Sequence, residues 1–248
     1  MLDSLKLYKR NLFSYFQKKI NIDDKKFYNK KLDYLFKFYN TDKSNSWHGF
    51  SKFYEKHFNK YKNKKINILE IGSFRGGSAA AFAKYFTKSN IICLDLNIKK
   101  FKYFSKRIKI LGLDVSNENS LKKFFNNQKF NNNSFDIIID DGSHKTSEIL
   151  LVFKNFFNLL NPGGYYVIED YKLSNFFKFF HDIKDIKVDL MLKKIKEKKK
   201  FKSKILINAF QQILFKKTDK VFNYSGNFKY KKNTTTTSSD ICFIKIKN

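Results

Sequence analysis

The residues of this chain that are best suited to chemistry follow two apolar runs. One run ends at Asp140 and continues into Asp141 and His144, and the other ends in Glu169 and Asp170. If these runs are neighbouring parallel strands, their carboxyl ends meet at the edge where open α/β sheets bind ligands. Carboxylate oxygens are the ligands that Mg²⁺ prefers, and a histidine can accept a proton near neutral pH. The pattern therefore indicates a metal site with a general base beside it.

The elements that would position these side chains begin at Ile66, where strand patterns start to alternate with helical ones. This alternation predicts a doubly wound α/β fold with helices on both faces of a parallel sheet. We predict five parallel strands, at 66–71, 91–94, 108–113, 135–140 and 165–168, with helices between them at 78–86, 99–106, 121–125 and 147–160. A lysine-rich helical segment follows, and two final strands, at 220–231 and 241–246, would add an antiparallel hairpin at one edge.

Residues 1–65 are predicted to form a helical N-terminal extension and lid on a domain that spans 66–248. Apolar residues recur there at helical spacing; they are Leu2, Leu5, Leu12, Phe13 and Phe16, and then Leu32, Leu35, Phe36 and Tyr39. A basic amphipathic start can lie on a membrane surface, but such a stripe more often covers a core or makes a dimer contact. We therefore expect a homo-oligomer and leave a peripheral membrane contact open. A polar loop between the helices holds the single tryptophan, Trp47.

The composition bears on partners and location. The formal charge of +29 is typical of proteins that bind nucleic acid or anionic membranes, but only three of the 51 basic residues are arginine. Because readers of base sequence depend on arginine forks, we do not expect a nucleic-acid partner. The two cysteines, Cys93 and Cys242, lie inside apolar runs, which predicts no disulfide framework and a cytoplasmic location. No run reaches the roughly 18 apolar residues that a transmembrane helix needs.

A candidate cofactor site follows the first strand, where a glycine-rich turn with Gly72 and Gly76 opens a helix. Glycine allows the sharp turn and the close approach of a ligand to the backbone. The turn lacks the Gly-x-Gly pair of the dinucleotide fingerprint, which disfavours NAD. Asp95, after the second strand, is placed to accept hydrogen bonds from ribose hydroxyls, and Asp114, after the third, to reach an adenine edge.

In their order along the chain, the glycine turn, Asp95, Asp114, the Asp140–Asp141 strand end and the turn at 161–164 resemble the class I S-adenosylmethionine-dependent methyltransferases. More specific sequences narrow the resemblance to the metal-dependent sugar O-methyltransferases of the macrocin and mycinamicin type. These are Asp141-Gly142-Ser143-His144, Glu169-Asp170, Thr41-Asp42-Lys43 and His48-Gly49-Phe50. A cephalosporin hydroxylase-like protein of the same fold, and a nucleic-acid-binding protein or methyltransferase, are the alternatives.

The resemblance implies an O-methyltransferase with S-adenosylmethionine and Mg²⁺ as cofactors and a sugar, glycan or glycolipid as acceptor. It implies cofactor contacts from Glu70, Gly72, Ser73, Gly76, Ser78, Asp95, Asp114 and Asp140. The implied metal ligands are Asp141, Glu169 and Asp170, with His144 as the general base and Asp141 as the second catalytic residue. Asp42, Lys43 and His48 would contact the substrate or belong to the lid.

Overall fold

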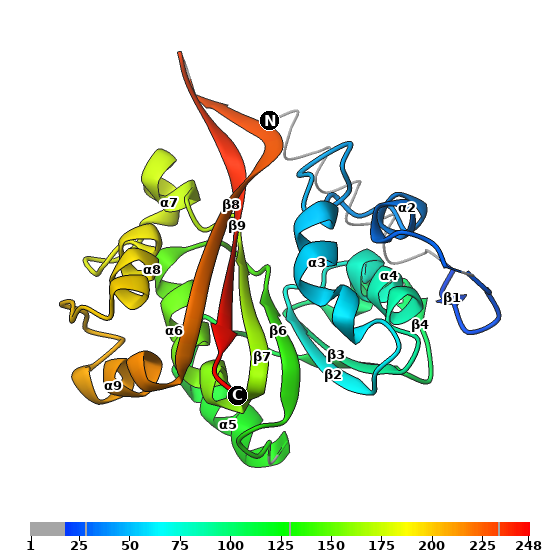
Figure 1. Ribbon diagram of the computed structural model, residues 1–248, viewed down its shortest axis with the longest axis horizontal. Helices are drawn as coiled ribbons and strands as arrows, with labels where there is room; N and C mark the ends of the chain where they lie inside the picture. The colour runs from blue at the N-terminus through cyan, green and yellow to red at the C-terminus, as the bar shows by residue number, and fades with distance from the viewer. Residues whose placement is uncertain (1–17, 28, 129, 233) are drawn as a thin grey trace.

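The computed structural model describes residues 18–248 with the exception of 28, 129 and 233. The apolar stripe predicted between Leu2 and Phe16 lies outside the described residues. Within them, the chain forms a seven-stranded sheet in the order β5-β3-β2-β6-β7-β9-β8 (Figure 1). A two-residue pairing of β1 (Ile20–Asn21) with β4 (Tyr103–Phe104) lies apart from this sheet.

The strands of the main sheet confirm the predicted topology. Five are parallel: β2 (Ile66–Ile71), β3 (Ser89–Asp95), β5 (Ile108–Gly112), β6 (Phe135–Asp140) and β7 (Leu160–Glu169). The hairpin of β8 (Thr218–Lys232) and β9 (Thr235–Ile246) follows, with β9 antiparallel to β7. Because β2 pairs with β3 on one side and β6 on the other, the strand order reverses there, and such a switch point leaves a crevice at the carboxyl ends.

Helices cover both faces of the sheet, and each face has its own hydrophobic core (Figure 1). One face carries α2 (Leu32–Phe38), α3 (Ser51–Phe58) and α4 (Gly77–Tyr85). The other carries α5 (Glu118–Gln128), α6 (Thr146–Phe156), α8 (Val188–Glu197) and α9 (Asn208–Lys217), with the short α7 (Leu173–Phe176) nearby. The extension therefore contributes α2 and α3 to the same core as β2 and α4. Among the described residues, no helix has both the length and the apolar character to cross a membrane.

One predicted helix is wrong. Residues 99–106 form no α-helix; a 3₁₀ turn, η2 (Ile98–Lys100), leads instead into β4. The side chains of Phe101, Tyr103 and Ser105 are buried while that of Phe104 is exposed, which is the two-residue alternation of a strand. Pairing with the distant β1 gives this short strand its partner, and that contact leaves no trace in the local sequence.

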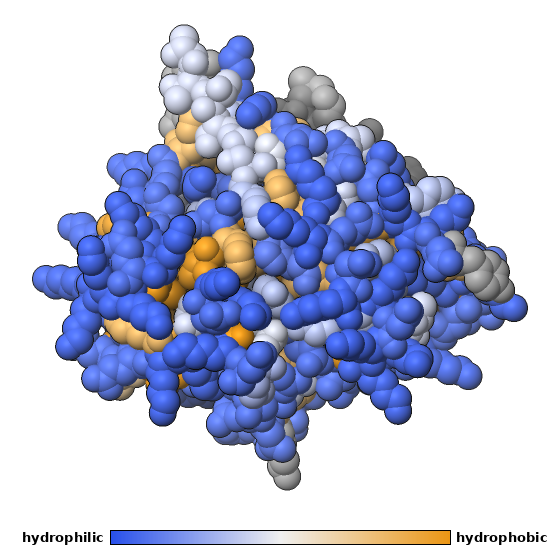
Figure 2. Space-filling model, in the orientation of Figure 1, coloured by the Kyte–Doolittle hydropathy of each residue, from blue (hydrophilic) through white to orange (hydrophobic). Residues whose placement is uncertain are grey.

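The β8–β9 hairpin is much longer than the strand beside it. Its pairing with β7 ends at Glu169, but the two hairpin strands remain paired as far as Lys232 and Thr235, so the outer part projects beyond the sheet (Figure 1). A register shift between Ser225 and Lys229 precedes this outer part. The face shown in Figure 2 is covered mainly by hydrophilic side chains, as a lysine-rich chain with solvated lysines would be.

Candidate active site

The glycine turn after β2 holds two strand ends close together. Gly72 has a φ of 83°, and a Cβ at this position would collide with the backbone carbonyl of Asp141. Its N–H donates to the carbonyl of Leu94 at 2.8 Å. Gly76 precedes α4 with a φ of 77°, where a Cβ would collide with the ring of Phe101. Both positions therefore require glycine, for conformation and for space.

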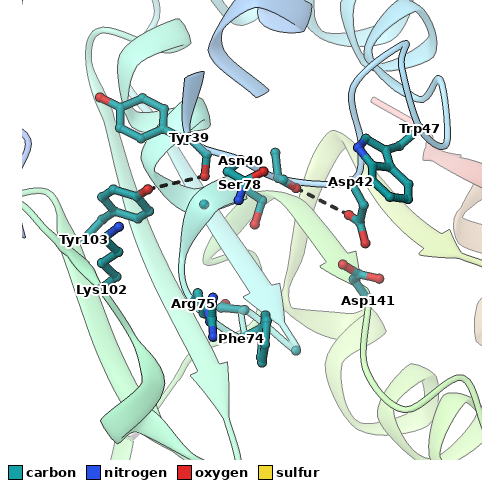
Figure 3. A pocket seen from close by; sticks show the side chains of 14 residues that line it. Tyr39, Asn40, Asp42, Trp47, Phe74, Arg75, Ser78, Lys102, Tyr103 and Asp141 are labelled. Carbon is teal, nitrogen blue, oxygen red and sulfur yellow. Dashed lines mark hydrogen bonds between the residues drawn. The ribbon is translucent and has the colours of Figure 1, made fainter. Parts of the chain in front are cut away.

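Two adjoining cavities open at the carboxyl ends of the strands. The first has a volume of about 580 Å³ and lies between the glycine turn and the loop that contains Asp42 and Trp47 (Figure 3). The second, of about 630 Å³, lies over the ends of β3, β5 and β6. Gly72 and Asp141 border both cavities. Each volume falls within the range of roughly 300–1,000 Å³ that is usual for small-molecule sites.

The predicted cofactor residues divide between these cavities and the protein interior. Gly72, Ser73 and Ser78 border the first cavity, and Asp95 and Asp114 border the second, where Gly72 also lies. The two oxygens of Asp95 accept backbone N–H groups of Phe74 and Asn97, both at 2.7 Å, so the carboxylate is fixed in position. Glu70, Gly76 and Asp140 border neither cavity.

Glu70 and Asp140 are both buried. Neither oxygen of Glu70 has a hydrogen-bond partner among the described residues. Burial raises the pKa of Glu70, and the charge of Lys43 opposes that rise. Burial also raises the pKa of Asp140, to about 8, although the backbone N–H of Gly142 opposes it. The charge of Asp140 acts on Tyr166, whose ring packs against α6, so Asp140 belongs to the core on that face of the sheet and not to the cavity lining.

A buried lysine occupies the centre of the acidic cluster. Lys43 is 1% exposed, and its Nζ donates to Asp141 Oδ2 at 2.5 Å and to Glu169 Oε2 at 2.7 Å. The hydroxyl of Tyr54, on α3, donates to the other oxygen of Glu169. Burial alone would lower the pKa of Lys43, but the charges of Asp141 and Glu169 raise it well above its usual range. Two of the predicted metal ligands therefore converge on one cation, and that cation is an ammonium group.

The third predicted metal ligand, Asp170, contacts His48 and not Lys43. It has a φ of 49°, and its Oδ2 lies 3.5 Å from His48 Nδ1. Burial would raise the pKa of Asp170, but the contact with His48 holds it below its usual value. Among the described residues, no three His, Cys, Asp or Glu side chains are arranged to hold a metal ion. In this arrangement Asp141 and Glu169 contact Lys43, whereas Asp170 contacts His48.

His144, the predicted base, lies beside Asp141 at the second cavity. Its Nε2 is 3.9 Å from Asp141 Oδ1, and its side chain borders the second cavity at 22% exposure. His144 has a φ of 60°, a left-handed conformation that non-glycine residues seldom adopt. Strained positions of this kind cluster at functional sites, and both His144 and Asp170 show one here.

Some residues of the site escape prediction from the sequence. Tyr54 lies at helical spacing among other aromatic residues, so nothing distinguishes its buried hydroxyl from core packing. Phe228 and Tyr230 come from the projecting hairpin and reach the site only through the fold. Their one local signal is the aromatic residues in an otherwise polar hairpin tip.

Comparisons with known proteins relate this chain to methyltransferases. Residues 69–171 match a family described as "Methyltransferase domain". The chain is 32% identical over 139 residues to mycinamicin VI 2''-O-methyltransferase of Micromonospora griseorubida and to demethylmacrocin O-methyltransferase of Streptomyces fradiae. It is 30% identical over 140 residues to 8-demethyl-8-alpha-L-rhamnosyl tetracenomycin-C 2'-O-methyltransferase of Streptomyces olivaceus. Each alignment covers 53% of this chain and 34–36% of the relative, so the chain spans about a third of the length of these proteins.

A solved structure shares the fold. The MycE methyltransferase of the mycinamycin biosynthetic pathway, in complex with Mg and SAH, superposes with a TM-score of 0.65 and 23% identity over 89% of this chain and 56% of that one. At this identity the likeness concerns the fold alone. Residues 69–171 of this chain therefore match a methyltransferase domain, and the chain is similar to the macrocin- and mycinamicin-type O-methyltransferases.

Proposed function

We propose that this protein is an S-adenosylmethionine-dependent O-methyltransferase that methylates a hydroxyl group of a sugar or a glycan-like acceptor. The observation that carries the proposal is the position of Asp141, which borders both cavities and faces His144. A carboxylate and an imidazole thus lie beside each other where the two cavities adjoin. One relative named above acts, by its name, on a rhamnosyl tetracenomycin, which supports a glycoside as the acceptor.

The cofactor would lie across the carboxyl ends of β2, β3 and β5. The Gly72 turn allows a ligand to approach the backbone closely. Asp95 is fixed by two backbone N–H groups but keeps further lone pairs for the ribose hydroxyls. Asp114 borders the same cavity and would face the adenine. Unlike these residues, Glu70 would not touch the cofactor directly, because its carboxyl group is buried. It would act on the cofactor only through neighbouring residues.

A divalent ion suits the donor set of the acidic cluster. Asp141, Glu169 and Asp170 offer the hard oxygen ligands that Mg²⁺ prefers, and the first two already share one cation. To hold the ion together, these three residues would have to converge: the Lys43 ammonium would have to leave its position between Asp141 and Glu169, and Asp170 would have to leave its contact with His48. A bound Mg²⁺ would lower the pKa of an acceptor hydroxyl and so favour its deprotonation.

His144 would remove the proton of the acceptor hydroxyl, and the two cavities would position the reacting atoms. A neutral imidazole at His144 would take the proton of the acceptor hydroxyl as the oxygen attacks the methyl carbon. Asp141, 3.9 Å away, would orient the ring and stabilise the imidazolium that forms. The leaving sulfur of a sulfonium departs as a neutral thioether, so no acid is needed. Alignment of oxygen, carbon and sulfur by the two adjoining cavities would supply much of the remaining rate.

Methyl transfer from isotopically labelled S-adenosylmethionine to a panel of methyl glycosides, followed by mass spectrometry, tests the proposal. We expect a product one methyl group heavier, formed with Mg²⁺ and lost with EDTA. His144→Ala should lower turnover about 10²–10⁴-fold, whereas the matched control His181→Ala should leave it unchanged, because His181 borders neither cavity. Salt-sensitive RNA binding without methylation of any glycoside would favour a nucleic-acid function instead. Activity that survives both EDTA and Asp141→Ala would exclude the metal-assisted mechanism.

A further inference from the structure

The loop between α2 and α3 separates into residues that face inward and residues that face outward. Lys43 and His48 are 1% and 8% exposed and are engaged by the acidic cluster. By contrast, the side chain of Asp42 is 63% exposed, and Trp47 is 55% exposed. Of the three loop residues predicted to touch a substrate, only Asp42 is thus free to do so, and Trp47 joins it.

The indole of Trp47 is held in place by the projecting hairpin. It stacks on Phe228, with ring centroids 6.1 Å apart and an angle of 26° between the planes. Phe228 in turn stacks on His48 at 5.3 Å. The backbone N–H of Asn227 donates to the carbonyl of His48 at 2.7 Å, which fixes the hairpin to the loop. An aromatic column from two distant parts of the chain thus supports one exposed indole.

This indole borders the first cavity beside the reactive residues. In Figure 3, Trp47 lies next to Asp42 and on the same side of the cavity as Asp141, while Arg75, Lys102 and Tyr103 lie at the opposite side. The Trp47 end therefore combines an aromatic face with the carboxylates of Asp42 and Asp141, and Arg75 and Lys102 lie across the cavity from it. An anionic ligand would be repelled at this end, whereas a neutral ligand with an apolar face and hydroxyl groups fits it.

We propose that Trp47 and Asp42 form the acceptor subsite, in which the indole stacks against the C–H face of a pyranose ring. This inference rests on the function proposed above and identifies the residues that select the acceptor. The faces of an aromatic ring are negative, so they attract the weakly positive C–H groups that cover one side of a sugar. Asp42 accepts hydrogen bonds from the hydroxyl groups at the edge of the ring. The hydroxyl to be methylated then points towards Asp141 and His144.

Because Trp47 is the single tryptophan of the chain, its fluorescence reports binding at the subsite directly. We would titrate the full-length protein with methyl α-L-rhamnopyranoside and with the acyclic polyol sorbitol as control. The proposal predicts a saturable change in tryptophan emission with the glycoside and none with sorbitol. The absence of a saturable change with the glycoside, or an equal change with sorbitol, would overturn it.

The kinetics of two variants show whether the acceptor needs an aromatic ring at position 47 or only a large side chain. For the glycoside acceptor, Trp47→Leu should raise KM by about tenfold, equivalent to about 1.4 kcal/mol, while Trp47→Phe retains most of the affinity. In both variants kcat and the affinity for S-adenosylhomocysteine should match those of the wild type. The control is Phe179→Leu, an aromatic residue that is 69% exposed and borders neither cavity, and it should change nothing.

The outcomes distinguish this inference from the proposed function. If the wild type methylates glycosides and Trp47→Leu has an unchanged KM, the subsite is wrong and the function stands. If Trp47→Leu loses affinity for S-adenosylhomocysteine as strongly as for the glycoside, Trp47 supports the cofactor and the subsite is again wrong. If no glycoside is methylated, the proposed function fails, and the fluorescence titration still decides whether a sugar binds at Trp47.

Discussion

Replacement of Lys43 by methionine tests the central electrostatic feature of the site. The substitution keeps a long apolar side chain but removes the charge between Asp141 and Glu169. Removal of one partner from a buried ion pair typically costs about 3–5 kcal/mol, because a buried charge is left uncompensated. Glu169 is 2% exposed and should suffer the full effect, whereas Asp141, at 21%, is partly reached by water. We therefore expect a loss within this range in unfolding free energy at neutral pH.

Thermal and urea unfolding of the two proteins would measure this loss. For a chain of this size, 1 kcal/mol shifts the melting temperature by about 2–4 °C, so Lys43→Met should melt about 6–20 °C lower than the wild type. The deficit should shrink as the pH falls. Burial already raises the pKa of Glu169 well above its usual value, with help from Asp141, and Lys43 opposes that rise. Without Lys43 the folded state takes up a proton at Glu169 that the unfolded state does not, which stabilises the variant on acidification.

Magnesium gives the same experiment a second readout. If the carboxylates can hold a divalent ion once the ammonium is absent, Mg²⁺ at a hundred times its Kd should restore about 2.7 kcal/mol to Lys43→Met. The matched control is Lys37→Met, which removes a surface pair with Asp33 at 2.8 Å from a lysine that is 52% exposed. That control should lose only about 0.5 kcal/mol at most. A loss in Lys43→Met no larger than in this control would refute the electrostatic reasoning.

Three further predictions concern the base, the glycine turn and acid stability. His144→Ala should lower kcat about 10²–10⁴-fold with unchanged calorimetric affinity for S-adenosylhomocysteine, and an equal loss of both would make His144 structural. Gly72→Ala should abolish that affinity and lower the melting temperature, because its Cβ would collide with the Asp141 carbonyl; unchanged binding would contradict this. Burial, with Lys56 and Lys60, lowers the pKa of His57 from 6.5 to about 4. The unfolding free energy should therefore fall as the pH is lowered from 6.5 to about 4, because only the unfolded state takes up the proton in this range. Urea unfolding of His57→Phe should show a weaker fall over this range, and an identical pH dependence would exclude His57 as the cause.

The framework of the fold was predictable because its signals are local. Buried parallel strands appear as short isoleucine-rich runs, and the turn after Ile71 must contain glycine where the backbone has a positive φ. The five predicted parallel strands overlap those observed for these reasons. The β1–β4 pair was missed because its two strands lie about 80 residues apart and each has only two residues.

The acidic cluster was predictable in its members but not in its partners. Asp141 and Glu169 follow strands that must end at the same edge, so their proximity follows from the topology. Nothing in the sequence shows which cation lies between them. Lys43 is 98 residues from Asp141 and 126 from Glu169, in a polar loop that resembles any solvated loop. The sequence thus indicates a need for positive charge, and only the fold identifies the group that supplies it.

The balance of charge around Asp141 links this finding to methyl transfer. Burial would lower the pKa of His48, but Asp170 raises it, so Asp170 favours the charged form of His48 as Asp141 and Glu169 favour the charged form of Lys43. When His48 is protonated, Asp141, Glu169 and Asp170 face two cations, and the oxygen of Asp141 that Lys43 leaves free lies towards His144. If a sulfonium binds beside it, as proposed, the cluster attracts the methyl donor more strongly than the neutral thioether that remains after transfer. Before Mg²⁺ binds, this excess of negative charge would therefore favour replacement of product by fresh cofactor, and a bound Mg²⁺ would weaken that preference because it neutralises the same carboxylates.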